Sequence, residues 1–204
     1  YHSDENASRR YPVLYTTDGH YPFQSVAGVT MAPMTHGGFE HMIIVGVSYA
    51  IGEDGAASRG RDLTPVPNPR NRDAVTGGAP AFFAFLRDEA LPLVDARYRT
   101  DPARRIYAGQ SYGGLFGAYA LLQPTALFSD YILTSPSLWF ANRAMFDIEA
   151  EFAKTHGNLP ARVYFAIGAT ETPAINGGRY DMVGDQKRFA KILRSRNYEG
   201  LVVR

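Results

Sequence analysis

The chain contains no cysteine among its 204 residues, which excludes disulfides, thiolate metal ligands and a cysteine nucleophile. It also lacks any apolar run near the roughly 18 residues that a membrane-spanning helix needs, so no span is expected. Charge of one sign is not in excess, because 21 Lys and Arg stand against 20 Asp and Glu. The resulting net charge of +1 gives no field to attract nucleic acid or an anionic membrane.

What the chain does have is the composition of a globular domain. Apolar residues make up 45% and charged residues 20%, and 204 residues are enough for one domain with a substantial core. We therefore interpret 1–204 as a single domain. The first residues, Tyr1 to Asn6, include no initiator Met, and the run from Gly200 to Arg204 is typical of a strand that is just beginning. The expectation is a fragment of a longer chain, with segments missing at both ends.

Apolar runs alternate with amphipathic stretches along the chain, which favours a mostly parallel sheet with helices on both faces. Residues 49–76 are predicted to form one long polar loop, and Pro92 should kink or restart a helix because it has no N–H to donate. We expect strands at 11–16, 41–47, 105–108, 130–134, 163–167 and from 201 onward, and helices at 79–98, 114–122, 142–154 and 182–194.

The strongest chemical signal is the Gly-x-Ser-x-Gly motif Gly109–Gly113, with Ser111 at its centre. The five-residue pattern alone is weak, but here an expected strand precedes it and an expected helix follows it. That context is typical of a nucleophile elbow, in which small neighbours allow a serine to sit on a strained turn. The start of the helix also directs free N–H groups and a positive dipole end at the site. The competing interpretation is a glycine-rich turn that packs a helix on a sheet.

An acyl-transfer site needs two N–H donors for the oxyanion. The backbone N–H of Tyr112, directly after the nucleophile, is one candidate. The second should come from the loop after the first strand, where Asp18 and Gly19 form a tight turn and offer the N–H of His20. Taken by itself, this turn needs no catalytic explanation.

The acid of a catalytic triad belongs after the second strand beyond the nucleophile. Glu171 follows the strand expected at 163–167 and is the first choice. Asp181 and Asp185 are rivals, although Asp181 suits the cap of the next helix and Asp185 suits its first turn.

The general base is missing from its expected place, because no histidine follows Glu171. His156 precedes the strand at 163–167 and should lie at the opposite edge from the nucleophile, while His20 is out of order for a triad. His36 and His41 do not have the spacing of a zinc motif, so no metal site is expected. We expect the catalytic histidine beyond Arg204.

Two features suggest a substrate pocket. Trp139, the single tryptophan, follows the strand at 130–134 on the same edge as Ser111; ordinary core packing is the alternative. Within the long loop, Arg61 belongs to a cluster that could bind a carboxylate or catecholate, or could simply brace the loop through Asp62. The other arginines of this cluster are Arg59, Arg70 and Arg72.

Four blocks occur in an order that resembles the putative-esterase family of α/β-hydrolases. That family includes ferric-enterobactin and salmochelin esterases, feruloyl esterases, S-formylglutathione hydrolase and mycobacterial mycolyltransferases. The blocks are Tyr11–Gly19, Arg61–Pro65, Gly109–Gly114 and Ser135–Trp139, of which the second and fourth favour the siderophore-esterase-like branch.

The resemblance implies an α/β-hydrolase fold, Ser111 as nucleophile, Tyr112 and the Gly19–His20 loop as oxyanion hole, and no cofactor. It matches Glu171 to the acid only loosely, since some siderophore esterases are described as Ser–His dyads. The predicted function is hydrolysis of a small-molecule carboxylic ester through an acyl-enzyme, and the candidate substrates are siderophore and aromatic esters. The alternatives are acyl transfer with the same nucleophile and a hydrolase scaffold that only binds. The resemblance slightly favours a secreted or periplasmic location.

Overall fold

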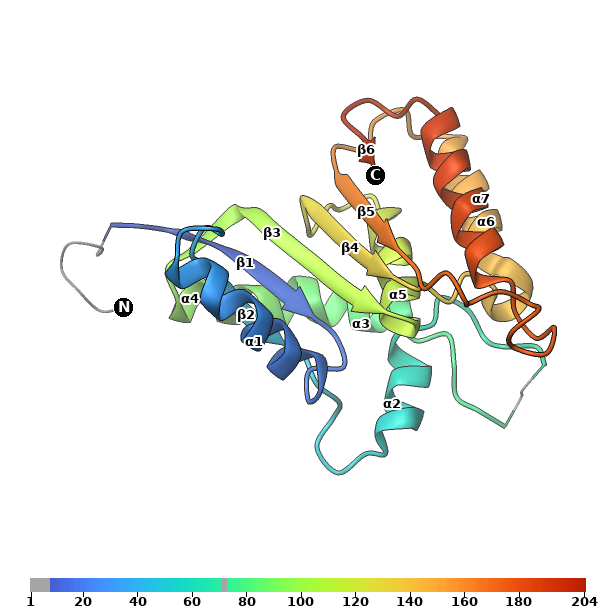
Figure 1. Cartoon of the computed structure of the whole chain (residues 1–204), viewed down its shortest axis with the longest axis horizontal. Coiled ribbons are helices and arrows are strands. Elements are labelled where there is room, and N and C mark those ends of the chain that lie inside the picture. The colour runs from blue at the N-terminus through green and yellow to red at the C-terminus, as the bar shows by residue number, and fades with distance from the viewer. Residues whose placement is uncertain (1–7, 71–72) are drawn as a thin grey trace.

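The computed structural model describes residues 8–70 and 73–204. Its centre is a single six-stranded sheet in the order β2-β1-β3-β4-β5-β6, in which every pair of neighbours is parallel (Figure 1). The parallel α/β architecture expected from the sequence is therefore confirmed. The strands are β1 (Tyr11–Thr16), β2 (Ile43–Gly46), β3 (Thr100–Gln110), β4 (Asp130–Thr134), β5 (Arg162–Ala166) and β6 (Val202–Val203).

Helices cover both faces of the sheet, with α1 on one face and α3, α4 and α5 on the other (Figure 1). This division follows from right-handed crossovers, because the chain reverses its direction across the sheet after β2. The helices are α1 (Pro22–Thr35), α2 (Gly55–Asp62), α3 (Ala79–Phe85), the π-helical turn η2 (Leu86–Ala90), α4 (Leu91–Arg97), α5 (Tyr112–Leu121), α6 (Phe140–Ala153) and α7 (Met182–Ser195).

The prediction of one long polar loop at 49–76 is wrong in part, because this segment contains the helix α2. This helix begins at an N-cap, where the Asp54 side chain accepts a hydrogen bond from the Ala57 N–H at 2.9 Å. Ser58 is its only buried residue, so α2 has no apolar stripe from which the sequence could have predicted it.

The helix expected at 79–98 is present but divided into α3, η2 and α4. The π-helical turn ends one residue before Leu91, and Pro92 then occupies the first turn of α4, where an N–H is not needed. The predicted restart at Pro92 is confirmed. The strand expected at 105–108 is longer, beginning at Thr100, and its pairing with β1 shifts register between Tyr11 and Val13.

The connections of β1 and β3 leave toward opposite faces of the sheet. In open parallel sheets, ligands bind in the crevice at the carboxyl ends of two such strands. Beneath that crevice the core between the sheet and α5 is rich in aromatic side chains. Tyr107 packs against Phe116 and Phe128, with ring centroids 5.8 and 5.3 Å away. These ring contacts pack α5 and the segment before β4 against β3.

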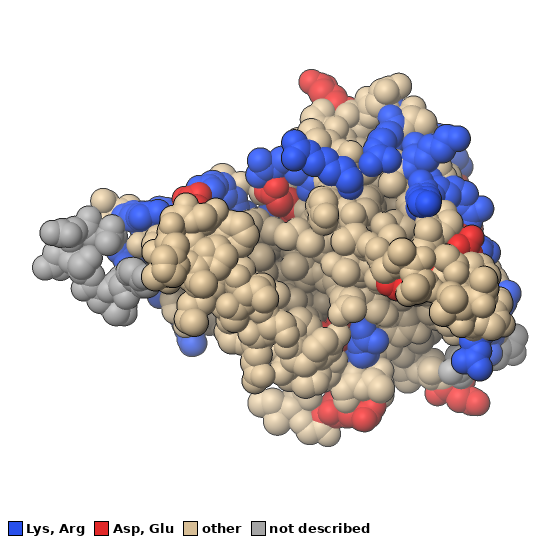
Figure 2. Space-filling model, viewed as in Figure 1, with Lys and Arg blue, Asp and Glu red and all other residues tan. Residues whose placement is uncertain are grey.

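Figure 2 shows that Lys and Arg side chains gather over β5, β6 and α7, whereas the surface over α1 is mostly uncharged. The sheet face that α1 partly covers also exposes apolar side chains on its far strands, with Ile132 37%, Tyr164 54% and Val202 45% exposed. Within the described residues, no helix has both the length and the hydropathy to cross a membrane.

Candidate active site

Ser111 lies on a strained turn between β3 and α5. Its φ of 57° and ψ of −114° are a conformation that a residue with a Cβ rarely adopts. The flanking glycines are required by space. A Cβ on Gly109 would lie 2.4 Å from the carbonyl group of Gly113, and one on Gly113 would lie 2.5 Å from Thr17 Oγ1. The motif thus has the backbone geometry of a nucleophile elbow.

Hydrogen bonds from the neighbouring strand hold this turn in place. The Ser111 N–H donates to the Thr134 carbonyl at 3.0 Å, and the Ser137 N–H donates to the Ser111 carbonyl at 3.1 Å. The two hydroxyl groups, Ser111 Oγ and Ser137 Oγ, are 3.2 Å apart. Ser137 is buried beside the nucleophile, and sequence reasoning missed it although it lies within the Ser135–Trp139 block.

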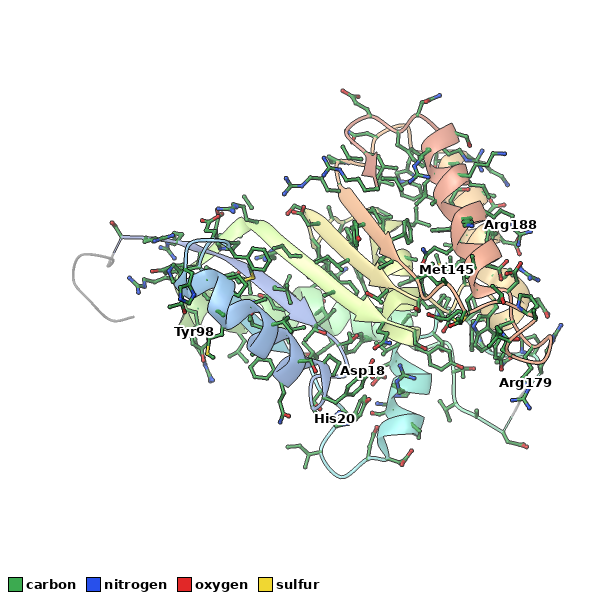
Figure 3. The ribbon with its side chains drawn as sticks, in the orientation of Figure 1. Asp18, His20, Tyr98, Met145, Arg179 and Arg188 are labelled. Carbon is green, nitrogen blue, oxygen red and sulfur yellow. The ribbon has the colours of Figure 1, made fainter. Side chains whose placement is uncertain are left out.

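Two backbone N–H groups at this edge of the sheet have no hydrogen-bond acceptor among the described residues. Tyr112 begins α5, so its N–H lacks an intrahelical partner. In the turn after β1, the Gly19 N–H donates to the Val47 carbonyl at 3.0 Å and the Tyr21 N–H to the Asp18 carbonyl at 3.2 Å, which leaves the His20 N–H. Asp18 and His20 lie together at the end of β1 (Figure 3). These are the two donors that the sequence selected.

Glu171 lies in the turn after β5, half-buried. Its Oε1 accepts hydrogen bonds from Ser135 Oγ at 2.6 Å and from the Gly168 N–H at 2.9 Å. Ser135 and Ser137 lie on the same loop after β4. This loop therefore contacts the acid candidate through Ser135 and the nucleophile through Ser137.

The two rival acids have structural partners instead. Asp181 accepts a hydrogen bond from the Gly184 N–H at 2.9 Å as the N-cap of α7. The Asp185 side chain is 4% exposed and pairs with Arg143 at 2.7 Å and Arg188 at 3.0 Å. Of the three acids, Glu171 is the one without a capping or ion-pairing role.

No histidine in the described part of the chain contacts Ser111. The His156 ring stacks on Phe152 with centroids 4.1 Å apart, before β5 begins, and His36 lies just after α1. The exposed His20 ring packs against Tyr49, with centroids 4.8 Å apart. The proton acceptor of a triad is therefore not among these side chains. Within 8–70 and 73–204, no three His, Cys, Asp or Glu side chains form a cluster suited to a metal ion.

An aromatic cluster surrounds Tyr112, the residue directly after Ser111. Trp139 stacks on Tyr180, with centroids 3.9 Å apart and planes 22° apart, and the Tyr112 ring lies 6.3 Å from the Trp139 ring. Phe140 contacts Tyr112 edge-on at 5.5 Å. The indole N–H of Trp139 is buried and has no partner among the described residues. Tyr180 was not predicted, because nothing in its loop signals a contact with a residue 41 positions earlier.

Arg61 does not reach this cluster. Its Nε donates to Asp62 at 2.7 Å and a terminal nitrogen donates to Glu53 at 2.9 Å; these hydrogen bonds raise the pKa of the guanidinium. The contacts support the bracing interpretation. Arg59 is the arginine at the site, with its guanidinium carbon 5.1 Å from the centre of the Tyr112 ring. Arg70 lies elsewhere on the loop, and Arg72 lies outside the described residues.

A parallel sheet with helices on both faces, and a serine on a strained strand-to-helix turn at its crevice, define an α/β-hydrolase. The chain belongs to the putative esterase family, which matches residues 1–202.

The chain is similar to two esterases and to a serine hydrolase of known structure. Ferri-bacillibactin esterase BesA of Bacillus subtilis is 29% identical over 177 residues, covering 79% of this chain and 60% of that protein. The siderophore triacetylfusarinine C esterase of Aspergillus fumigatus is 29% identical over 149 residues, covering 71% and 50%. The structure of an IroE-like serine hydrolase from Shewanella oneidensis matches with a TM-score of 0.80 at 26% identity, covering 98% of this chain and 64% of that one. The chain thus spans between 50% and 64% of these relatives.

Proposed function

We propose that the protein is a serine esterase that hydrolyses a carboxylic ester through an acyl-enzyme on Ser111. The observation that carries the proposal is the strained conformation of Ser111 together with two N–H donors, those of Tyr112 and His20, that have no acceptor within 8–70 and 73–204. Free, preoriented donors of this kind stabilise an oxyanion more in the transition state than in the substrate.

In the proposed reaction, Ser111 Oγ bonds to the ester carbonyl carbon while a general base takes its proton. The carbonyl oxygen becomes an oxyanion that accepts hydrogen bonds from the two N–H groups. The bond to the alcohol oxygen then breaks, and the base returns the proton to that oxygen. Water then attacks the acyl-enzyme in the same way: the base takes its proton, the bond to Ser111 Oγ breaks, and the proton passes to Ser111 as the acid is released. We assign Glu171 to orient the base, and the base itself to a histidine outside residues 1–204.

Labelling with a fluorophosphonate tests the nucleophile without knowledge of the substrate. We expect intact-mass analysis to find one adduct, on Ser111, in protein with its native ends, and none after Ser111→Ala. Ester turnover should fall by at least about 1,000-fold in that variant. Residues 1–204 alone should label far more slowly, because they lack the base. An adduct on another residue, or unchanged turnover in Ser111→Ala, contradicts the proposal.

Among the described residues, Ser111 has a hydroxyl partner in Ser137 but no histidine partner, which favours one second candidate, a hydrolase scaffold that binds without cutting. No labelling of Ser111 in protein with its native ends supports this candidate over the esterase.

For the substrate class, we propose an aromatic or siderophore ester whose ring packs against Trp139 and Tyr180. The stacking of Trp139 on Tyr180 next to Tyr112 supports this assignment, as do the named activities of the two siderophore-esterase relatives. Trp139→Ala should raise the KM for an aromatic ester about tenfold and leave the KM for an acetate ester nearly unchanged. Equal effects on both esters would argue against a ring-binding role.

A further inference from the structure

Two consecutive residues that follow β1, Thr17 and Asp18, are each connected to the start of α5 through another side chain. Thr17 Oγ1 lies 3.2 Å from the Tyr107 hydroxyl, which donates to the Gly113 carbonyl at 2.7 Å. This first bridge is buried below the crevice and joins the backbone on the two sides of it.

The second bridge lies above the first and uses charge. The Asp18 side chain is 1% exposed, and its carboxylate accepts hydrogen bonds from Arg59 Nε at 2.9 Å and from the Tyr49 hydroxyl at 2.6 Å. A second nitrogen of Arg59 donates to the other carboxylate oxygen at 3.3 Å. The Arg59 guanidinium also lies over the Tyr112 ring, with its carbon 5.1 Å from the ring centre. One arginine thus contacts the residue two before His20 and the residue directly after Ser111.

The backbone of Asp18 shows that this bridge holds a strained turn. Its φ is 55°, a left-handed conformation that asparagine, aspartate and glycine tolerate best. That conformation sends the chain sharply into Gly19 and leaves the His20 N–H without an acceptor. A buried carboxylate needs partners to remain in place, and Arg59 and Tyr49 supply them.

Arg59 also cancels an unfavourable charge. A bare carboxylate at Asp18 would repel an oxyanion forming beside His20 and Tyr112. Burial lowers the pKa of Arg59, but the hydrogen bond to Asp18 and the charge of that carboxylate outweigh it and raise the pKa. Burial and the bond to Asp18 raise the pKa of the Tyr49 phenol as well, so it remains a neutral donor.

We propose that Asp18, Arg59 and Tyr49 are positioning residues that hold the His20 and Tyr112 N–H groups at one fixed separation and neutralise the charge beside them. This inference rests on the proposed esterase function and extends it to residues that do not touch the reacting atoms.

The test compares this trio with a matched one far from the crevice. Glu149, whose side chain is 1% exposed, accepts two hydrogen bonds at 2.9 Å from Arg196 and one at 2.9 Å from the Tyr198 hydroxyl. Arg59→Met and Arg196→Met therefore each remove an arginine from a buried carboxylate that also accepts from a tyrosine. Both variants are made in protein with its native ends, and Ser111→Ala is measured in parallel.

We expect Arg59→Met to lower kcat for an ester about 10- to 100-fold while KM changes less than about threefold. The affinity for phenylboronic acid, which forms a tetrahedral adduct on the nucleophile, should fall by the same factor as kcat. Arg59→Lys should recover part of both losses, because the charge returns without the two-pronged hydrogen bond. Arg196→Met should lower thermal stability and leave kcat, KM and boronate affinity unchanged.

Two failures are distinguishable. If Ser111→Ala leaves turnover unchanged, the esterase proposal is wrong and the positioning role falls with it. In the other case, Ser111→Ala abolishes turnover, but Arg59→Met has the same kcat and boronate affinity as the control Arg196→Met. The esterase proposal then stands and the positioning role is wrong.

Discussion

A buried hydroxyl group can raise or lower the stability of the fold, depending on whether it has a hydrogen-bond partner. Two tyrosines of the core show the contrast. Tyr15 is 1% exposed, and its hydroxyl has no hydrogen-bond partner among the described residues. Burial, together with the nearby Asp95 charge, raises its pKa to about 12. Tyr107 is equally buried, but its hydroxyl is bonded to the Gly113 carbonyl.

We predict that Tyr15→Phe stabilises the fold by about 1 kcal/mol, because it removes a buried polar group that gains nothing in return. Tyr107→Phe, the matched control, should destabilise it by about 1–2 kcal/mol, because it removes a buried hydrogen bond to the Gly113 carbonyl. Urea unfolding followed by circular dichroism measures both. A loss of stability in Tyr15→Phe would contradict the assignment of an unpaired hydroxyl.

Residues that carry a local signature were predictable, and residues defined by a distant contact were not. Ser111 and Tyr112 belong to one short motif, and Trp139 is the single tryptophan beside an expected strand end. Tyr180 and Arg59 gain their places only from packing on Trp139 and Tyr112, far along the chain. No periodicity or spacing encodes such contacts.

The turn at Ser111 depends on a glycine, because at position 109 there is no room for a Cβ atom. Gly109→Ala would bring a Cβ to 2.4 Å from backbone atoms of Gly113, a contact that no rotamer can relieve. We predict that it destabilises the fold by about 2–4 kcal/mol or displaces Ser111 enough to abolish fluorophosphonate labelling.

The control for Gly109 is Gly28, which is exposed within α1 and has open space around its Cβ position. Gly28→Ala should stabilise the protein by about 0.5–1 kcal/mol, since alanine is the better helix former, and should leave labelling intact. Thermal unfolding and intact mass after labelling report both outcomes. If Gly109→Ala behaves like Gly28→Ala, the elbow is not sterically tight.

Prediction of elements succeeded where burial gave a pattern and failed where it did not. β1 is an apolar run that is buried along most of its length, and α7 places Phe189 and Leu193 on one buried face. The polar helix α2 has no such face. Missing it obscured which arginine faces the site, because Arg59 and Arg61 are two residues apart on a helix and so point in different directions. The sequence alone favoured Arg61; the helix directs Arg59 to Tyr112.

At the scale of the whole molecule, the buried phenols connect stability to alkaline pH. Burial raises the pKa of Tyr15, Tyr107 and Tyr131 above the ordinary value for tyrosine, and these side chains are at most 2% exposed. In the unfolded chain the same groups ionise near about pH 10. Between that pH and their folded-state pKa values, the unfolded chain binds fewer protons than the folded one, so the free energy of unfolding falls as the pH rises.

Each such phenol contributes a slope of about 1.4 kcal/mol per pH unit, so the three together should remove about 4 kcal/mol per unit above about pH 10. We predict that urea midpoints are nearly constant from pH 8 to 9.5 and fall steeply from pH 10 to 11. Tyrosinate absorbance at 295 nm should show these phenols ionising only when the chain unfolds. Tyr131→Phe should reduce the slope by about 1.4 kcal/mol per pH unit, the contribution of one phenol. A flat stability profile up to pH 11 would mean that the three phenols ionise within the folded protein, against the burial that the sheet and α5 impose on them.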